Sequence, residues 1–163
     1  MKNIILIRHA KSSWDQPLRD IDRPLTSRGI RDAHLVSQAL QVYIPKKFIV
    51  WCSSAKRTKE TAMIFSQNLN FLFENITFKE ELYTFDEDKL SKIIKNCENK
   101  YDNLILFGHN EAITNFVNKF GTKFVDNVPT SGVVIIRFDI ERWDEISKGT
   151  LIKTLFPRDL RNE

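Results

Sequence analysis

Short apolar runs alternate with helical stripes along the chain, and their order predicts the fold. Runs typical of buried strands lie at residues 4–7, 48–52, 103–107, 133–138 and 151–156, with a weaker one at 76–78. Apolar residues recur at helical spacing within residues 33–43, 55–69, 90–97 and 113–120. Strands that alternate with helices predict an α/β fold, a three-layer α/β/α sandwich with a mainly parallel central sheet.

The last two strand-like runs, "SGVVIIRFD" and "TLIKTLF", have no helical stripe between them. They therefore predict an antiparallel pair at one edge of the sheet. The chain contains no internal repeat and no Pro/Gly/Ser-rich linker. Its 163 residues are enough for one core, so we expect a single domain over residues 1–163.

Charge and composition narrow the classes of function. The formal net charge is +4, but the basic residues are scattered and no aromatic residues are interleaved with them, so no nucleic-acid partner is expected. No apolar run approaches 20 residues, and the N-terminus lacks a signal sequence. Cys52 and Cys97 lie in apolar stretches without a CxxC pattern. These features predict a cytoplasmic protein with no membrane partner.

Chemistry-bearing residues follow three of the predicted strands. Arg8 and His9 come directly after the first strand, Arg57 follows the second in "VWCSSAKRTKETA", and His109 follows the fourth in "LILFGHNEAI". The carboxyl ends of parallel strands meet at one rim of an open α/β sheet, where ligands bind. Helix N-termini at the same rim favour a phosphate or a carboxylate. We therefore expect these residues to surround one anion.

Two arginines and two histidines around an anion are suited to phosphoryl transfer. Guanidinium groups match phosphate oxygens in a forked geometry and stay charged. A neutral histidine can attack phosphorus to give a phosphohistidine, while the second donates to a phosphoryl oxygen. This scheme requires no metal and no cofactor, and the histidines and acidic residues show no metal-ligand spacing.

Four motifs in order carry a resemblance to a known family. "LIRHAKSSW" resembles the Arg-His signature of the histidine phosphatase superfamily. "DIDRPLTSRG", "CSSAKRTKETA" and "LILFGHNEA" are similar to the following motifs of its small phosphohistidine phosphatase branch, the SixA-type proteins. The resemblance runs from about residue 3 to the last strand.

This resemblance implies a phosphoglycerate mutase-like fold and a role for each matching residue. His9 is then the phosphorylated nucleophile, and Arg8, Arg57 and His109 surround the phosphoryl group. The resemblance also implies that Arg23 reaches the same pocket. The spacing of residues alone would leave Arg23 as a loop residue held by Pro24.

The general acid is the most open part of the hypothesis. Larger relatives place an acidic residue after the second helix to protonate a leaving oxygen, and "KEELYTFDED" offers several. Glu81 or Glu80 fits best by position, and Glu81 is our candidate; the alternative is an exposed loop acid. A phosphohistidine substrate reduces the need for an acid because imidazole leaves more easily than an alkoxide.

Three functions remain open. The leading hypothesis is a metal-independent phosphatase that acts on phosphohistidine of a signalling or phosphotransfer protein. Larger superfamily members insert lids that enclose small metabolites between the second helix and the following strand. Here only about 30 residues separate the second helix from the strand at Asn103, so we expect a shallow, open pocket. The alternative is a phosphatase for small phosphomonoesters. A phosphoryl-binding module without turnover would not need His9. An open pocket also predicts a monomer.

Overall fold

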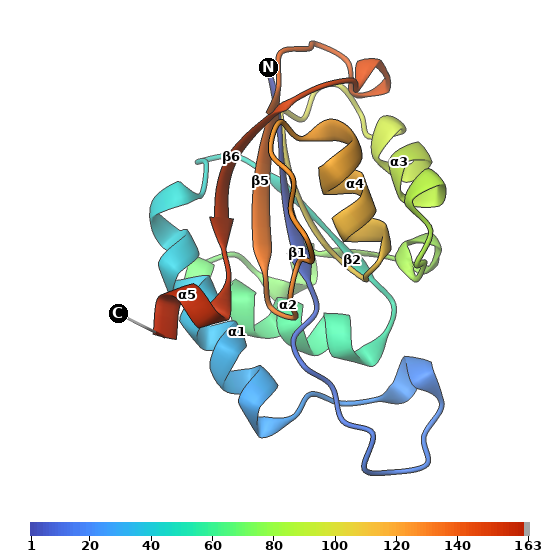
Figure 1. Ribbon diagram of the computed structural model, residues 1–163, viewed down its shortest axis with the longest axis vertical. Coiled ribbons are helices and arrows are strands. Elements are labelled where there is room, and N and C mark those ends of the chain that lie inside the picture. The colour runs from blue at the N-terminus through green and yellow to red at the C-terminus, as the bar shows by residue number, and fades with distance from the viewer. Residues whose placement is uncertain (162–163) are drawn as a thin grey trace.

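The apolar runs form a six-stranded sheet in the computed structural model, which describes residues 1–161 (Figure 1). The strand order is β3-β2-β4-β1-β5-β6. The strands are β1 (Lys2–Arg8), β2 (Ile49–Ser53), β3 (Thr77–Lys79), β4 (Asn103–Gly108), β5 (Val133–Phe138) and β6 (Thr150–Leu155). The predicted runs therefore match the strands to within about two residues.

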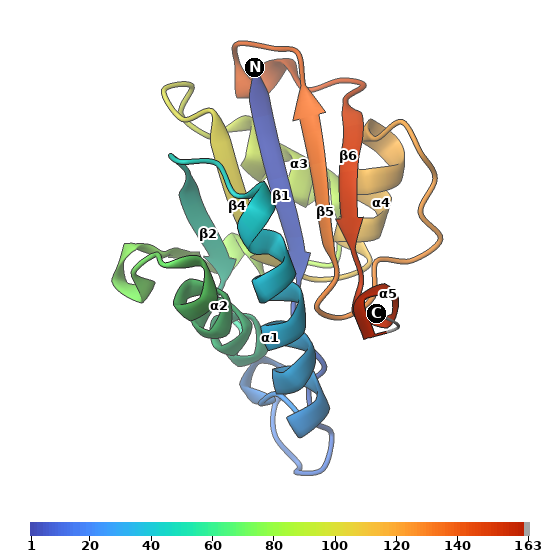
Figure 2. The same cartoon turned by 90° about the vertical axis from the view of Figure 1, so that its left-hand side faces the viewer.

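Helices cover both faces of this sheet, so the predicted three-layer arrangement is confirmed. They are α1 (Ser27–Leu40), α2 (Lys56–Leu69), α3 (Glu87–Lys95), α4 (Ala112–Phe120) and α5 (Pro157–Arg161). Figure 2 shows α1 and α2 in front of the sheet and α3 and α4 behind it. The short α5 packs against α1 and was not predicted, since five residues carry no helical stripe.

Strand directions agree with the prediction. β1, β2, β3 and β4 are mutually parallel, whereas β5 is antiparallel to both β1 and β6. β6 therefore runs in the same direction as β1. Ile7 pairs with Val133, which pairs with Leu155, so the ends of β1 and β6 lie at the same level.

Alternation along the strands divides the core into two clusters. Ile4 and Leu6 of β1 face α3 and α4, whereas Ile5 and Ile7 face α1 and α2. All four side chains are buried. β1 is thus buried on both faces, as its continuous apolar run indicates, and this rigid strand carries Arg8 and His9 to the rim.

Local signals account for where two of the helices, α1 and α3, begin. Thr26 caps α1 by accepting a hydrogen bond from the backbone N–H of Gly29 at 2.9 Å, and Asp86 caps α3 in the same way through Lys89. Among residues 1–161, none of the helices has the length and apolarity needed to cross a membrane.

Candidate active site

The four residues predicted from the strand ends come together at one rim of the sheet. Arg8 pairs with Gly108 in the β1–β4 register, and the backbone N–H of His9 donates to the Gly108 carbonyl at 3.1 Å. His109 follows Gly108 directly, and Arg57 lies in the first turn of α2 beside the end of β2. Parallel pairing of adjacent strands therefore builds the cluster, as expected.

His9 is held as a neutral imidazole whose Nε2 carries a lone pair. Its Nδ1 lies 2.7 Å from the carbonyl oxygen of Ala10, which only accepts, so Nδ1 carries the proton. Nε2 accepts from Arg57 Nε at 3.4 Å. Burial, together with the charges of Arg57, Arg8 and Arg23, lowers the pKa of His9 to about 3. His9 is therefore unprotonated at neutral pH.

His109 faces His9, with ring centroids 5.3 Å apart. Its Nε2 lies 2.8 Å from Ser53 Oγ, and its Nδ1 is 3.4 Å from Arg57 Nη2, which only donates. Burial, His9 and Arg57 lower the pKa of His109 to about 2. The buried Ser53, at the end of β2, thus orients the second histidine; the sequence did not predict this contact.

Arg57 connects both histidines to the loop before α1. Its guanidinium is 2% exposed and donates through Nη1 to the Asp20 carbonyl at 2.7 Å and through Nη2 to Asp20 Oδ2 at 3.0 Å. Every nitrogen of the guanidinium therefore has a partner that fixes its plane.

Arg8 reaches the cluster from the end of β1 and has a hydrogen-bond donor that is not used within the protein. Its Nη1 donates to the carbonyl of Val128 at 2.9 Å. Its Nε is buried and has no hydrogen-bond partner among residues 1–161. Burial, and next the charge of Arg57, lower the pKa of this guanidinium, which still leaves it charged. A buried donor without an acceptor is suited to receive an anion.

Arg23 joins the cluster, as the family resemblance implied. It is 6% exposed, donates to Ser12 Oγ at 2.7 Å, and forms an ion pair with Asp20 at 3.1 Å. Its guanidinium carbon lies 3.5 Å above the ring of Trp14. A loop residue is therefore held as firmly as one on a strand.

Asp20 is the site residue that sequence analysis missed. Its carboxylate accepts from Arg57, from Arg23 and from the hydroxyl of Tyr83, so it joins two of the arginines. Partial burial alone would raise the pKa of Asp20, but the hydrogen bonds from Tyr83 and Arg57 outweigh it and lower the pKa to about 2. The three-residue spacing to Arg23 was the available signal; Asp22 looks equally plausible in the sequence but pairs with Arg19.

The structure does not bring Glu81 to this cluster. Glu81 and Glu80 are exposed in a short 3-10 helix (Glu80–Leu82), and among residues 1–161 no hydrogen bond or ion pair joins either to the histidines or arginines. The residue of this segment that does reach the site is Tyr83. The assignment of Glu81 as general acid stays a prediction without a supporting contact.

The cluster as a whole is suited to a dianion. Arg8, Arg23 and Arg57 together with Asp20 leave a net charge of +2 when both histidines are neutral. Residues 1–161 contain no group of three or more His, Cys, Asp or Glu side chains placed to hold a metal ion. Two nitrogen bases and three guanidinium groups can bind a phosphoryl group and supply a nucleophile.

Comparison with known proteins gives the family. Residues 4–104 match the model of the histidine phosphatase superfamily (branch 1), so the chain belongs to this superfamily. It is 28% identical to an uncharacterized protein of Mycobacterium leprae, over 93% of this chain and 100% of that protein. It is 32% identical to an uncharacterized chloroplastic protein of Arabidopsis thaliana, over 68% of this chain and 55% of that one.

Solved structures show which known fold this chain resembles. The protein histidine phosphatase SixA complexed with tungstate superposes with a TM-score of 0.81 at 20% identity, over 97% of this chain and 99% of that one. A protein of Agrobacterium tumefaciens assigned as SixA superposes with a TM-score of 0.75 at 22% identity, over 94% and 97% of the two chains. The fold is therefore phosphoglycerate mutase-like and resembles that of SixA.

Proposed function

We propose that this protein is a phosphatase that removes the phosphoryl group from phosphohistidine on another protein by way of a phosphorylated His9. The observation that carries the proposal is the neutral His9, whose Nε2 lone pair lies within the arginine cluster. A nucleophile that needs no deprotonation, next to donors for the phosphoryl oxygens, is what such a transfer requires.

In the first step, Nε2 of His9 attacks phosphorus and the bond from phosphorus to the substrate imidazole breaks. The electron pair of that bond stays on the leaving nitrogen, and the substrate histidine departs as neutral imidazole if its other nitrogen carries a proton. In the second step, a water oxygen attacks phosphorus and the bond to His9 breaks. His9 regains its lone pair, and the oxygen of water leaves with both of its protons as part of inorganic phosphate, H2PO4−.

Arg8, Arg57 and His109 stabilise the charge on the transferred group. Arg8 Nε is buried without a hydrogen-bond partner among residues 1–161 and so has capacity for an oxygen ligand, and Arg57 Nε can turn from His9 Nε2 to the transferred group once that nitrogen is phosphorylated. A bound dianion favours the imidazolium form of His109, opposing the burial and positive charges that lower its pKa in the free protein. His109 then donates through Nδ1 to the phosphoryl oxygens.

The leaving group favours phosphohistidine over an ester. Asp20, the carboxyl group within the cluster, has a pKa of about 2 and is ionised at neutral pH, so it cannot protonate an alkoxide. Among residues 1–161, no hydrogen bond or ion pair joins the exposed Glu81 to the cluster. An imidazole leaving group needs no such acid. The rim is also open: Trp14 is 75% and Phe85 53% exposed, which suits a protein substrate.

One experiment tests the covalent step. The protein is mixed briefly with a phosphohistidine peptide and quenched, and the phosphate bound to it is examined. We expect acid-labile, base-stable phosphate on the wild-type chain and none on His9→Ala. Full phosphatase activity of His9→Ala would overturn the mechanism.

A second experiment tests the substrate. Turnover of a phosphohistidine protein is compared with turnover of sugar and alkyl phosphates under the same conditions. We expect higher kcat/KM for the phosphohistidine protein. Preference for the esters would overturn this substrate assignment and favour the phosphomonoesterase.

A further inference from the structure

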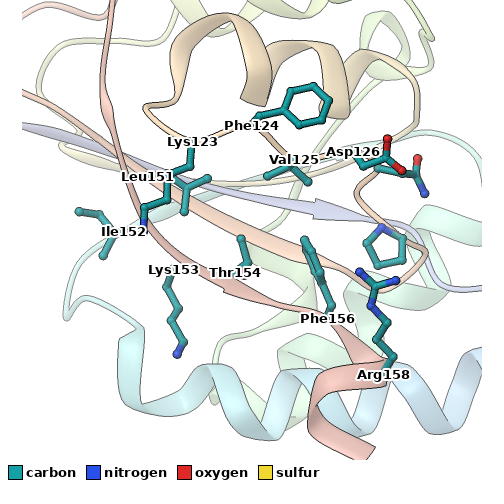
Figure 3. A pocket seen from close by; sticks show the side chains of 12 residues that line it. Lys123, Phe124, Val125, Asp126, Leu151, Ile152, Lys153, Thr154, Phe156 and Arg158 are labelled. Atoms are coloured by element: carbon teal, nitrogen blue, oxygen red, sulfur yellow. The ribbon is translucent and has the colours of Figure 1, made fainter.

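A groove of about 650 Å³ lies between β6 and residues 123–129, which follow α4. Figure 3 shows Phe124 and Val125 on one side and Ile152, Thr154 and Phe156 on the other. Phe124 is 78% and Ile152 42% exposed. The groove therefore presents apolar side chains to solvent, away from the catalytic cluster.

Positive charge surrounds these apolar side chains. Lys123, Lys153 and Arg158 line the groove, and Asp126 is its one acidic lining residue. Arg158 is exposed and its carboxylate contact, to Asp159, is 3.9 Å long, so its charge is largely uncompensated. This combination favours a ligand that is both acidic and apolar.

β6 provides backbone groups for such a ligand. It is an edge strand that pairs with β5 alone, and within residues 1–161 no backbone hydrogen bond joins it to residues 123–129. The backbone N–H of Leu151 donates instead to the side chain of Thr122 at 3.1 Å. An extended peptide can pair with an exposed edge of this kind while its side chains enter flanking pockets.

One end of the groove, lined by Pro129 and Phe156, lies at the carboxyl end of β6, on the same side of the sheet edge as the rim that carries His9. β6 runs in the direction of β1 and ends level with it, two strand spacings away, which is about 10 Å. The carbonyl of Val128, next to the groove, accepts from Arg8, and the backbone N–H of Ser131 donates to the carbonyl of His9 at 3.1 Å. A bound chain can therefore reach both places with a spacer of about four residues.

We propose that this groove binds an extended segment of the substrate protein that alternates acidic and apolar residues, near its phosphohistidine. The proposal rests on the proposed function, because it places that substrate relative to His9. A second copy of this chain is a poorer occupant: antiparallel pairing of two β6 edges about their middle would bring the Lys153 side chains of both copies together.

The test uses two phosphohistidine peptides that differ only in charge. Each joins the phosphohistidine through a five-residue Gly/Ser spacer to a six-residue extension, alternating Glu and Val in one peptide and Lys and Val in the other; extensions on both sides are made. We expect the wild-type protein to hydrolyse the Glu peptide with about tenfold higher kcat/KM. The triple variant Lys123→Glu, Lys153→Glu, Arg158→Glu should reverse this preference.

Phosphoimidazole, which is too small to reach the groove, is the control substrate. We expect the wild-type protein and the triple variant to hydrolyse it with equal kcat/KM, which also shows that the variant is folded. Phe124→Ser, which keeps every charge, should lower the kcat/KM for the Glu peptide about threefold. Equal rates for the two peptides with the wild-type protein, or a preference unchanged in the triple variant, would overturn the proposal.

Binding separates failure of this proposal from failure of the proposed function. Fluorescence anisotropy of an unphosphorylated, labelled Glu–Val extension measures binding of the peptide to the groove without any catalytic step. We expect binding to the wild-type protein that the triple variant loses, even if no phosphoryl compound is hydrolysed. A concentration-dependent dimer that the triple variant dissociates would assign the groove to a second copy and overturn the proposal.

Discussion

The catalytic cluster and the groove each carry three cationic side chains, but they hold them in opposite ways. Arg8, Arg23 and Arg57 are buried or half-buried, and each is fixed by hydrogen bonds to acceptors at defined positions. The groove cations, Lys123, Lys153 and Arg158, are exposed or half-buried on flexible stems. The comparison separates charge that is positioned for chemistry from charge that attracts a partner.

Solvent explains why the two sets should behave differently. Groups in the cluster lie in a medium of low polarity, so burial first, and then the charges of the neighbouring arginines, lower the pKa of His9. Charges around the groove are screened by water and salt. A substitution in the cluster should therefore alter catalysis itself, whereas one at the groove should alter only affinity for a charged partner.

The largest difference in kcat/KM between the cluster and the groove is expected when one arginine in each region is replaced by lysine. Arg57→Lys should lower kcat/KM for phosphoimidazole by about 100- to 1000-fold, because an ammonium group cannot reproduce the forked contacts to His9 and Asp20. Arg158→Lys should leave this value unchanged. Steady-state kinetics checks both, and equal losses would remove the distinction between the two regions.

The histidines of the cluster should make stability depend on pH. The pKa values of His9 and His109 are lowered in the folded protein, to about 3 and about 2, so between pH 6.5 and 3 the unfolded chain binds more protons. Stability is therefore lost as pH falls below about 6.5, by about 2 kcal/mol per histidine at pH 5.

Urea unfolding at pH 7 and pH 5 measures this loss. His109→Gln should reduce the difference in unfolding free energy between the two pH values by about half. His34→Gln, which changes a half-buried histidine bonded to Asn68 outside the cluster, should leave it unaltered. If His34→Gln had the larger effect, the assignment of the pH dependence to the cluster would be wrong.

Removing the charge of Asp20 should have a smaller effect. Asp20→Asn keeps an oxygen acceptor but loses the ionic contacts to Arg57 and Arg23, which should lower kcat/KM for phosphoimidazole about tenfold. Asp22→Asn is the matched control, because Asp22 pairs only with Arg19 at an exposed position. Similar losses in both variants would show that Asp20 has no special task.

The smallest effect on kinetics is expected from removing the Trp14 ring that packs against Arg23. Trp14→Ala removes the aromatic ring 3.5 Å from the guanidinium of Arg23, a contact worth about 0.5–1 kcal/mol at an exposed position. We expect a two- to fivefold rise in KM for phosphoimidazole with kcat unchanged. A large fall in kcat would instead place Trp14 in direct contact with the reacting group.

Apolar periodicity was enough to predict the sheet, because β1 and β4 are buried on both faces and leave little choice of structure. Parallel strands then brought together Arg8, His9, Arg57 and His109 at a single edge. The sequence did not predict two short elements, α5 and the 3-10 helix at Asp20–Asp22, because contacts across the fold rather than a local pattern stabilise them.

Loop residues mark the limit of prediction from the residues alone. Arg23 was assigned to the site only through the resemblance to a family, since the position of its side chain depends on Ser12, Asp20 and Trp14. Glu81 was favoured by its place in the chain, yet the side chain of that segment that reaches the cluster is Tyr83. The direction of a side chain in a short turn is decided by how the turn packs against the rest of the fold, and this packing cannot be predicted from the local sequence.

The carboxylate of Asp20 also has a consequence for the end of each cycle of the proposed reaction. Because Asp20 already occupies donors of Arg57 and Arg23, a phosphoryl group that binds to these two arginines competes with an internal anion. In the proposed reaction, the same competition lowers the affinity for the released inorganic phosphate and so limits inhibition by the product.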